Sequence, residues 1–177
     1  MDLDQLRDDI IQSQKKGLPF IMTSVVIWFL IACVASLNIS FNIKNIMVFI
    51  CSCPLMPLAR IIGKKLGVNI FAEDNELGQL GFLFTLNQVI YLLIVMWVLN
   101  AVPEKMIMVY AMVFGAHLLP YSWLYKSNAY KIFAIIIPII SLILGMIFNG
   151  FVVASVLCVL EIFLVLTLKN EMKAYEK

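Results

Sequence analysis

Charged residues are scarce in this sequence. Asp, Glu, Lys and Arg make up 14% of the 177 residues, against about 25% in a typical soluble domain. Hydrophobic residues make up 63%, against about 45–50%. A soluble fold of this length could not bury so much apolar surface, so we expect lipid to solvate it. The net charge of +2 and the lack of a basic stripe argue against nucleic acid as a partner.

The motifs of soluble enzymes are also missing. The sequence has no glycine-rich phosphate loop, no His-x-x-x-His pair and no nucleophile elbow, and its one histidine is His117. Cysteines are few and lie inside apolar runs, where disulfides are uncommon, so we expect free thiols that act as small core residues. They are Cys33, Cys51, Cys53 and Cys158. The sequence therefore assigns no catalytic residue, no metal ligand and no cofactor.

The sequence contains six long apolar runs. They lie at residues 18–37, 43–62, 77–102, 106–124, 132–148 and 151–168. A membrane-spanning helix needs about 20 predominantly apolar residues. The runs therefore predict an all-α integral membrane bundle of six transmembrane helices, which together form one domain over residues 18–168. We expect a cytoplasmic amphipathic segment at residues 1–17 and a cytoplasmic tail at residues 169–177.

The first two runs need separate interpretation. A secretory signal has an apolar core of about 7–15 residues behind a basic start. Residues 18–37 are longer and follow a segment of mixed charge, so they predict a retained spanning helix. The second run contains Pro54, and proline removes a helical hydrogen bond, so we expect a kink there.

The distribution of basic residues predicts the orientation. Cytoplasmic loops of membrane proteins carry an excess of Lys and Arg. If the six runs alternate across the membrane, all of the 13 Lys and Arg except Lys44 and Lys105 lie on the side of the two termini. Both termini should therefore be cytoplasmic, in a multi-pass protein of the cell membrane.

Four polar residues lie near the middle of three of the runs. They are Asn87, Gln88, His117 and Glu161. At about 1.5 Å of rise per helical residue, all four fall within one thin layer of the bilayer. We therefore regard them as candidates for binding a substrate or a proton.

Glu161 is the acidic residue deepest inside an apolar run. A charged acid at mid-bilayer costs a few kcal/mol, so it must be protonated, paired or in contact with water. His117 is its candidate partner, and Tyr121 lies one helical turn further along the same face. The alternative interpretation is a neutral glutamic acid and a structural histidine that only join helices.

The amides of the third run have two interpretations as well. Asn87 shares a helical face with Tyr91, and Gln88 lies beside it. Amides in a bilayer commonly hydrogen-bond across helices, which would make them structural. Alternatively, Asn87, Gln88 and Tyr91 bind a polar group of a substrate beside Glu161.

Two stretches resemble a family of small, uncharacterised bacterial integral membrane proteins. They are Thr85-Leu-Asn-Gln and Phe114-Gly-Ala-His-Leu-Leu-Pro-Tyr-Ser-Trp-Leu-Tyr. The similarity covers most of the chain, including its acidic and then basic amino terminus. The resemblance implies a bacterial multi-spanning membrane protein, and it implies no activity.

Three classes of function agree with these observations. The first is a small transporter or channel-like protein with a polar layer at the midplane, which binds a small molecule or ion and is coupled to protons through Glu161 and His117. The second is a membrane-embedded enzyme that modifies a lipid with the same two residues as acid and base. The third is a non-catalytic structural or assembly protein. Six spans in 177 residues leave little material for a large cavity, so a homo-oligomer is also plausible.

Overall fold

A computed structural model describes residues 2–70 and 75–175, and no β-strand occurs among these residues. The helices are α1 (Leu3–Gln14), η1 (Lys15–Gly17), α2 (Leu18–Ser36), α3 (Phe41–Ser52), α4 (Leu55–Leu66), α5 (Glu76–Ala101), η2 (Pro103–Lys105), α6 (Met106–His117), α7 (Leu119–Leu124), α8 (Asn128–Ile147) and α9 (Gly150–Tyr175). Within the described residues, 6 helical segments are long and apolar enough to cross a membrane. The predicted all-α fold with six spanning helices is confirmed.

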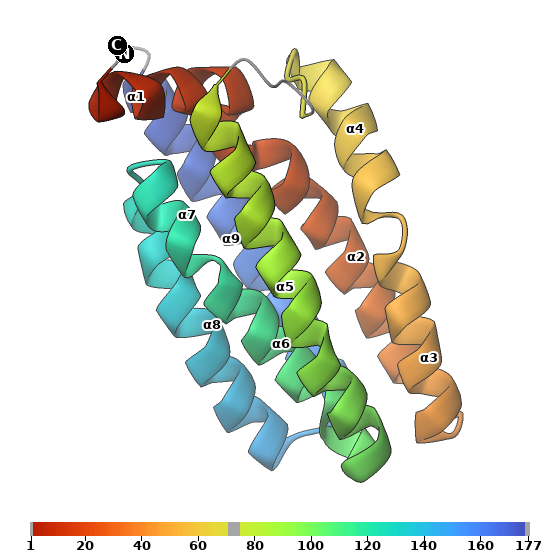
Figure 1. The fold of residues 1–177 in the computed structure, drawn as a ribbon. Coiled ribbons are helices and arrows are strands. Elements are labelled where there is room, and N and C mark those ends of the chain that lie inside the picture. The colour runs from red at the N-terminus through yellow and green to blue at the C-terminus, as the bar shows by residue number, and fades with distance from the viewer. Residues whose placement is uncertain (1, 71–74, 176–177) are drawn as a thin grey trace.

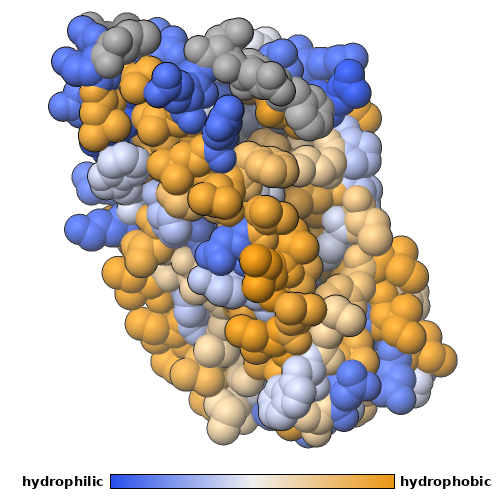
Figure 2. All heavy atoms as spheres, viewed as in Figure 1, coloured by the Kyte–Doolittle hydropathy of each residue, from blue (hydrophilic) through white to orange (hydrophobic). Residues whose placement is uncertain are grey.

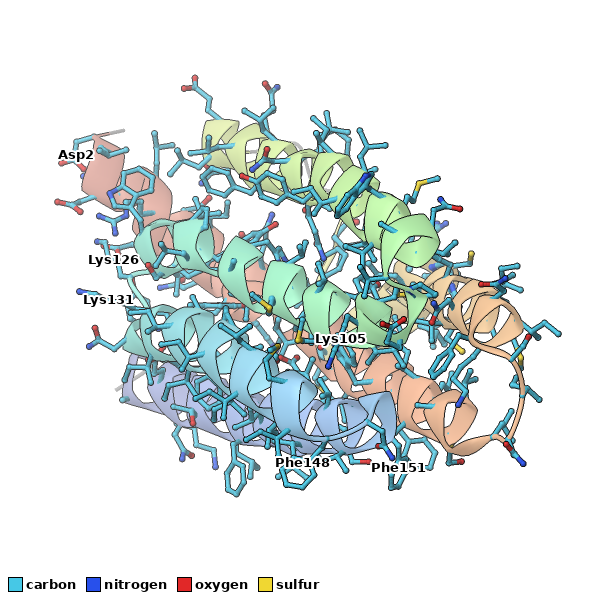
Figure 3. The ribbon with its side chains drawn as sticks, turned by 90° about the horizontal axis from the view of Figure 1, so that it is seen from below. Asp2, Lys105, Lys126, Lys131, Phe148 and Phe151 are labelled. Atoms are coloured by element: carbon cyan, nitrogen blue, oxygen red, sulfur yellow. The ribbon has the colours of Figure 1, made fainter. Side chains whose placement is uncertain are left out.

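The spanning helices run roughly side by side, and α1 lies across one end of the bundle, next to the last turns of α9 (Figure 1). We call this end the terminal end and the other the opposite end. Hydrophilic atoms gather at both ends, and an apolar band lies between them (Figure 2). Lys126 and Lys131 lie near Asp2, whereas Lys105 lies toward the other end with Phe148 and Phe151 (Figure 3). The surface therefore has the polarity that a bilayer requires.

The centre of the bundle is the packing of α2 against α9. One face of α9 is buried at helical spacing, from Val153 and Ala154 through Leu157 and Glu161 to Leu164. On α2, Trp28 is 1% exposed, and its ring lies 5.4 Å from that of Tyr110 and 5.6 Å from that of Phe114, both on α6. These contacts fix α2 between α9 and α6.

Glycines allow α6 and α8 to approach closely. A Cβ at Gly115 of α6 would lie 2.5 Å from Cγ2 of Ile137 and 2.6 Å from Cδ of Pro138. A Cβ at Gly145 of α8 would lie 2.3 Å from Cγ of Met108. Small residues at such crossings let helices pack by van der Waals contact, which drives helix association in lipid.

Two of the spans are broken rather than continuous. The second is divided at Cys53 and Pro54 into α3 and α4, which agrees with the kink expected from Pro54. The fourth is divided at Leu118 into α6 and α7, where the sequence predicts one uninterrupted helix. Pro120 has no N–H and cannot continue the helical ladder, so the chain starts a new helix at Leu119.

A tight reversal joins α1 to α2. Lys15, Lys16 and Gly17 all have positive φ, at 46°, 52° and 69°. The Lys16 ammonium lies 2.8 Å from the Glu171 carboxylate of α9, and the Tyr130 hydroxyl donates to the Lys16 carbonyl at 2.7 Å. These bonds offset the backbone strain of the left-handed residues and tie α1 to the terminal end.

Candidate binding site

A cavity of about 180 Å³ lies between α2, α4, α5 and the broken span α6–α7. It is large enough for a small organic molecule, since an engineered apolar cavity of about 150 Å³ binds benzene. Its walls are mostly apolar, with Ser24, Thr85, Gln88, His117 and Tyr121 among the polar residues. Among the described residues that line it, none is Asp, Glu, Lys or Arg.

Both helix breaks border this cavity. Leu55 and Met56, in the first turn of α4, line it from one side. His117, the last residue of α6, and Leu118, at the second break, line it from another. Two spanning helices are thus interrupted where they reach the cavity.

The break at Leu118 explains the position of His117. The Leu118 N–H donates to the Gly115 carbonyl at 3.1 Å, three residues back, and not to the Phe114 carbonyl as in a regular α-helix. The His117 imidazole donates from Nδ1 to the Phe114 carbonyl instead. A carbonyl oxygen can only accept, so Nδ1 must carry a proton. Nε2 is the ring nitrogen that this bond does not use.

Tyrosines form the terminal end of the cavity. Tyr121 lies 2.8 Å from Oγ1 of Thr85, hydroxyl to hydroxyl, so α7 is bridged to α5. The Tyr125 hydroxyl donates to Oε1 of Gln14 at 2.7 Å. Ring centroids are 6.0 Å apart between Tyr121 and Tyr125, and 5.8 Å apart between Tyr125 and Tyr130. The hydroxyls are bound to the protein, and the rings form a connected aromatic wall.

Glu161 lies behind Ser24. Its side chain is fully buried, and Oε2 is within hydrogen-bond distance of the Ser24 hydroxyl. The same hydroxyl lies 2.7 Å from the Ile21 carbonyl. A serine hydroxyl has one proton and cannot donate to both oxygens. Each bond has its own proton when Glu161 is the neutral acid and donates to Ser24, while Ser24 donates to Ile21.

Among the described residues, the second oxygen of Glu161 has no hydrogen-bond partner. Oε1 is buried and makes no hydrogen bond with any described residue. A buried polar atom without a partner costs about 1–3 kcal/mol, and more when the group is charged. The neutral acid therefore also lowers the cost of this unpaired oxygen.

The candidate residues from the sequence lie in three places. Gln88, His117 and Tyr121 line the cavity. Glu161 lies one side chain away from it, and its partner among the described residues is Ser24 rather than His117. The remaining candidates, Asn87 and Tyr91, are exposed on the outer face of α5 and do not line the cavity.

Sequence reasoning missed Ser24, which connects the cavity with Glu161. A serine in an apolar run is common, because its hydroxyl can bond to the helix backbone, as Thr23 does with the Pro19 carbonyl at 2.8 Å. Only the packing of α2 on α9 gives Ser24 its second partner. No group of three or more His, Cys, Asp or Glu that could hold a metal ion occurs in the described part of the chain.

Comparisons with curated proteins and with solved structures gave no match. Residues 3–171 match a family described as "Family of unknown function (DUF7010)". The match covers nearly the whole chain, including all six candidate spans up to residue 171. The resemblance to an uncharacterised family is confirmed to that extent. The chain is a member of the DUF7010 family of unknown function.

Proposed function

We propose that this protein is a small proton-coupled transporter, with the cavity between α2, α4, α5 and α6–α7 as its substrate site. The observation that carries the proposal is the pair of helix breaks at Pro54 and Leu118, both of which border the cavity. Secondary transporters commonly bind their substrates where spanning helices are interrupted, because the ends of the broken helices present backbone groups to the site.

The position of Glu161 supports proton coupling. It is fully buried and is joined to the cavity wall by Ser24. Ionisable residues inside membrane bundles commonly belong to substrate or proton pathways. In this proposal, Glu161 carries the proton, and Ser24 is the group through which the proton reaches the cavity.

The arrangement gives less support to a lipid-modifying enzyme. An acid–base pair needs both groups within about 2.6–3.2 Å of the reacting atoms, directly or through a water. Here His117 is bonded to the Phe114 carbonyl and Glu161 to the Ser24 hydroxyl. His117 and Glu161 thus have separate partners and are not bonded to each other, so they do not form an acid–base pair. This arrangement favours the transporter over the enzyme.

We also propose the orientation and the setting. The basic residues Lys126 and Lys131 lie at the terminal end (Figure 3), where an excess of Lys and Arg supports a cytoplasmic face. The terminal segments would then be cytoplasmic, in a multi-pass protein of a bacterial cell membrane. Exposed Asn87 on α5 supports a homo-oligomer, because an amide facing lipid gains from a partner on a second copy.

Thiol accessibility tests transport without knowledge of the substrate. In a protein whose four cysteines are replaced by alanine, Thr85→Cys places a thiol in the cavity wall. We expect a membrane-impermeant, positively charged methanethiosulfonate to label it from either face of oriented vesicles, since alternating access opens the site to both. The matched control is Ser141→Cys on α8, where the residue is 2% exposed and does not line the cavity, and it should not be labelled. Labelling of Thr85→Cys from one face only, or from neither, would refute transport.

A further inference from the structure

The cavity combines an aromatic wall, an absence of charged lining residues and a buried acid one side chain away. Building on the transport function proposed above, we propose that its substrate is a small organic cation with an apolar body, and that this cation exchanges for the proton of Glu161. The size, the wall and the charges of the cavity each support this substrate class.

The size restricts the substrate to a small molecule. The volume of about 180 Å³ exceeds only slightly the roughly 150 Å³ that accommodates benzene. One ring with a short substituent fits this space. The largely apolar lining, which includes Phe20, Ile21 and Leu55, requires that most of the molecule be apolar.

The aromatic wall favours a cation. Aromatic rings attract cations through their quadrupoles, and quaternary ammonium groups are bound in aromatic cages. The hydroxyls of Tyr121, Tyr125 and Tyr130 are already bonded to Thr85, Gln14 and the Lys16 carbonyl. What these tyrosines contribute to the cavity is therefore chiefly their rings.

The charges near the cavity disfavour an anion. Among its described lining residues there is no Lys or Arg to balance a negative charge. The lysines of the nearby reversal are engaged elsewhere, Lys16 with Glu171 at 2.8 Å and Lys15 with the Leu66 carbonyl at 2.6 Å. Glu161 can supply one negative charge after it releases its proton, which balances one monovalent cation.

The exchange conserves charge. In this proposal, Glu161 starts as the neutral acid, with its proton on Oε2 toward the Ser24 hydroxyl, which itself donates to the Ile21 carbonyl. When the cation enters, the O–H bond of Glu161 breaks, the proton passes by way of the Ser24 hydroxyl to water in the cavity, and the carboxylate balances the cation. One proton leaves for each cation bound, and the net charge of the site does not change.

The groups around Glu161 do not supply another charge. Lys16 of η1 is paired with Glu171, and Tyr110 of α6 is hydrogen-bonded to Ser52. Tyr130 of α8 and Cys158 of α9 also face Glu161, and Cys33 of α2 faces Cys158. The Tyr130 hydroxyl is bonded to the Lys16 carbonyl, and the His117 imidazole of α6 is bonded to the Phe114 carbonyl. Glu161 is therefore the group whose charge changes with cation binding.

Binding of three probes of similar size tests the substrate class. The intact protein in nanodiscs is titrated by calorimetry with benzyltrimethylammonium, benzyl alcohol and benzenesulfonate. We expect benzyltrimethylammonium to bind best and to release about one proton, seen with a pH indicator in weak buffer. Its affinity should rise by about tenfold per pH unit while Glu161 is protonated in the free protein. Equal or tighter binding of the alcohol or the sulfonate, or cation binding without proton release, would overturn the proposal.

Two variants assign the proton to Glu161. Glu161→Gln should abolish both proton release and the pH dependence of cation affinity. The matched control is Glu104→Gln, which changes an exposed acid outside the cavity and should behave as the wild type. Proton release that persists in folded Glu161→Gln would overturn the proposal. The comparison of the three probes uses only the wild type, so it tests the proposal even if Glu161→Gln does not fold.

Failure of this inference differs from failure of the proposed function. If Thr85→Cys is labelled from both faces but the cation does not bind, transport stands and the substrate class is wrong. If the cation binds with proton release but Thr85→Cys is labelled from one face only, the site is a cation-binding site without transport.

Discussion

Gly115→Ala should destabilise the bundle, because α6 and α8 leave no space for the added carbon. That Cβ would lie 2.5 Å from Cγ2 of Ile137 and 2.6 Å from Cδ of Pro138, whereas carbon atoms pack at about 3.5–4.0 Å. Ile137 is fully buried, so its side chain cannot move out into lipid. The helices must therefore separate by about 1 Å at this crossing.

The expected cost is the difference between two effects. Overpacking of a close contact costs about 1–3 kcal/mol, and replacing glycine by alanine in a helix returns up to about 1 kcal/mol. Three atoms of Ile137 and Pro138 would lie 2.5–2.7 Å from the added carbon, so we expect an overpacking cost of about 2–3 kcal/mol. The free energy of unfolding should therefore fall by about 1–2 kcal/mol. For a chain of this length, that corresponds to a fall in the melting temperature of about 2–8 °C.

Gly81→Ala is the matched control on α5. A Cβ there would meet Cδ2 of Leu124 at 3.4 Å, which is an ordinary contact with the end of a side chain. Its melting temperature should equal or exceed that of the wild type. Both variants are measured by thermal unfolding in the same detergent, followed by circular dichroism. Equal stability of Gly115→Ala and Gly81→Ala would refute the close-packing argument.

Two further predictions concern α1 and the helix break. The hydrogen bond between Lys126 and Asp8 raises the pKa of the lysine and lowers the pKa of the aspartate. The attachment of α1 should thus be strongest between the ordinary Asp and Lys pKa values of about 4 and 10. It should weaken as acid protonates Asp8, and also as base deprotonates Lys126. Hydrogen exchange of α1 amides measures this, and an Asp8→Asn variant whose exchange still accelerates to the same extent in acid would contradict it. His117→Ala should leave the Phe114 carbonyl without its side-chain donor and lower the free energy of unfolding by about 1–3 kcal/mol. Chemical denaturation in detergent measures the loss, and an unchanged midpoint would show that the bond does not stabilise the break.

The fold was predictable because each span carries its own signal. Apolar runs of about 20 residues identify spanning helices without knowledge of their neighbours, and Pro54 indicated a candidate break because proline lacks the N–H that a helix needs. The break at Leu118 was not predicted, although Pro120 lies in that run. A proline alone does not identify a break, because α8 continues through Pro138. Whether a proline breaks a helix depends on the neighbours that satisfy the freed carbonyls.

The site was only partly predictable, because the depth of a residue in the bilayer does not specify which face of its helix it occupies. Asn87 and Gln88 are adjacent in the sequence and lie at one depth, yet Gln88 lines the cavity and Asn87 is exposed. The hydrophobic pattern of α5 does not distinguish its faces, since apolar residues surround the helix. The partner of Glu161 depends on the packing of α2 against α9, which joins residues 137 positions apart.

The contact between α2 and α9 has a consequence for the assembly of this protein in the membrane. Helix α2 is synthesised well before its principal partner α9, and Lys16 and Glu171 are 155 positions apart. Until α9 is inserted, Lys16 lacks its carboxylate and Ser24 lacks Glu161. Without α9 the bundle is therefore incomplete, and the Lys16 ammonium has no carboxylate partner. A chain that is truncated before Glu161 should be recognised by membrane quality control, because the face of α2 that packs on α9 then has no partner helix.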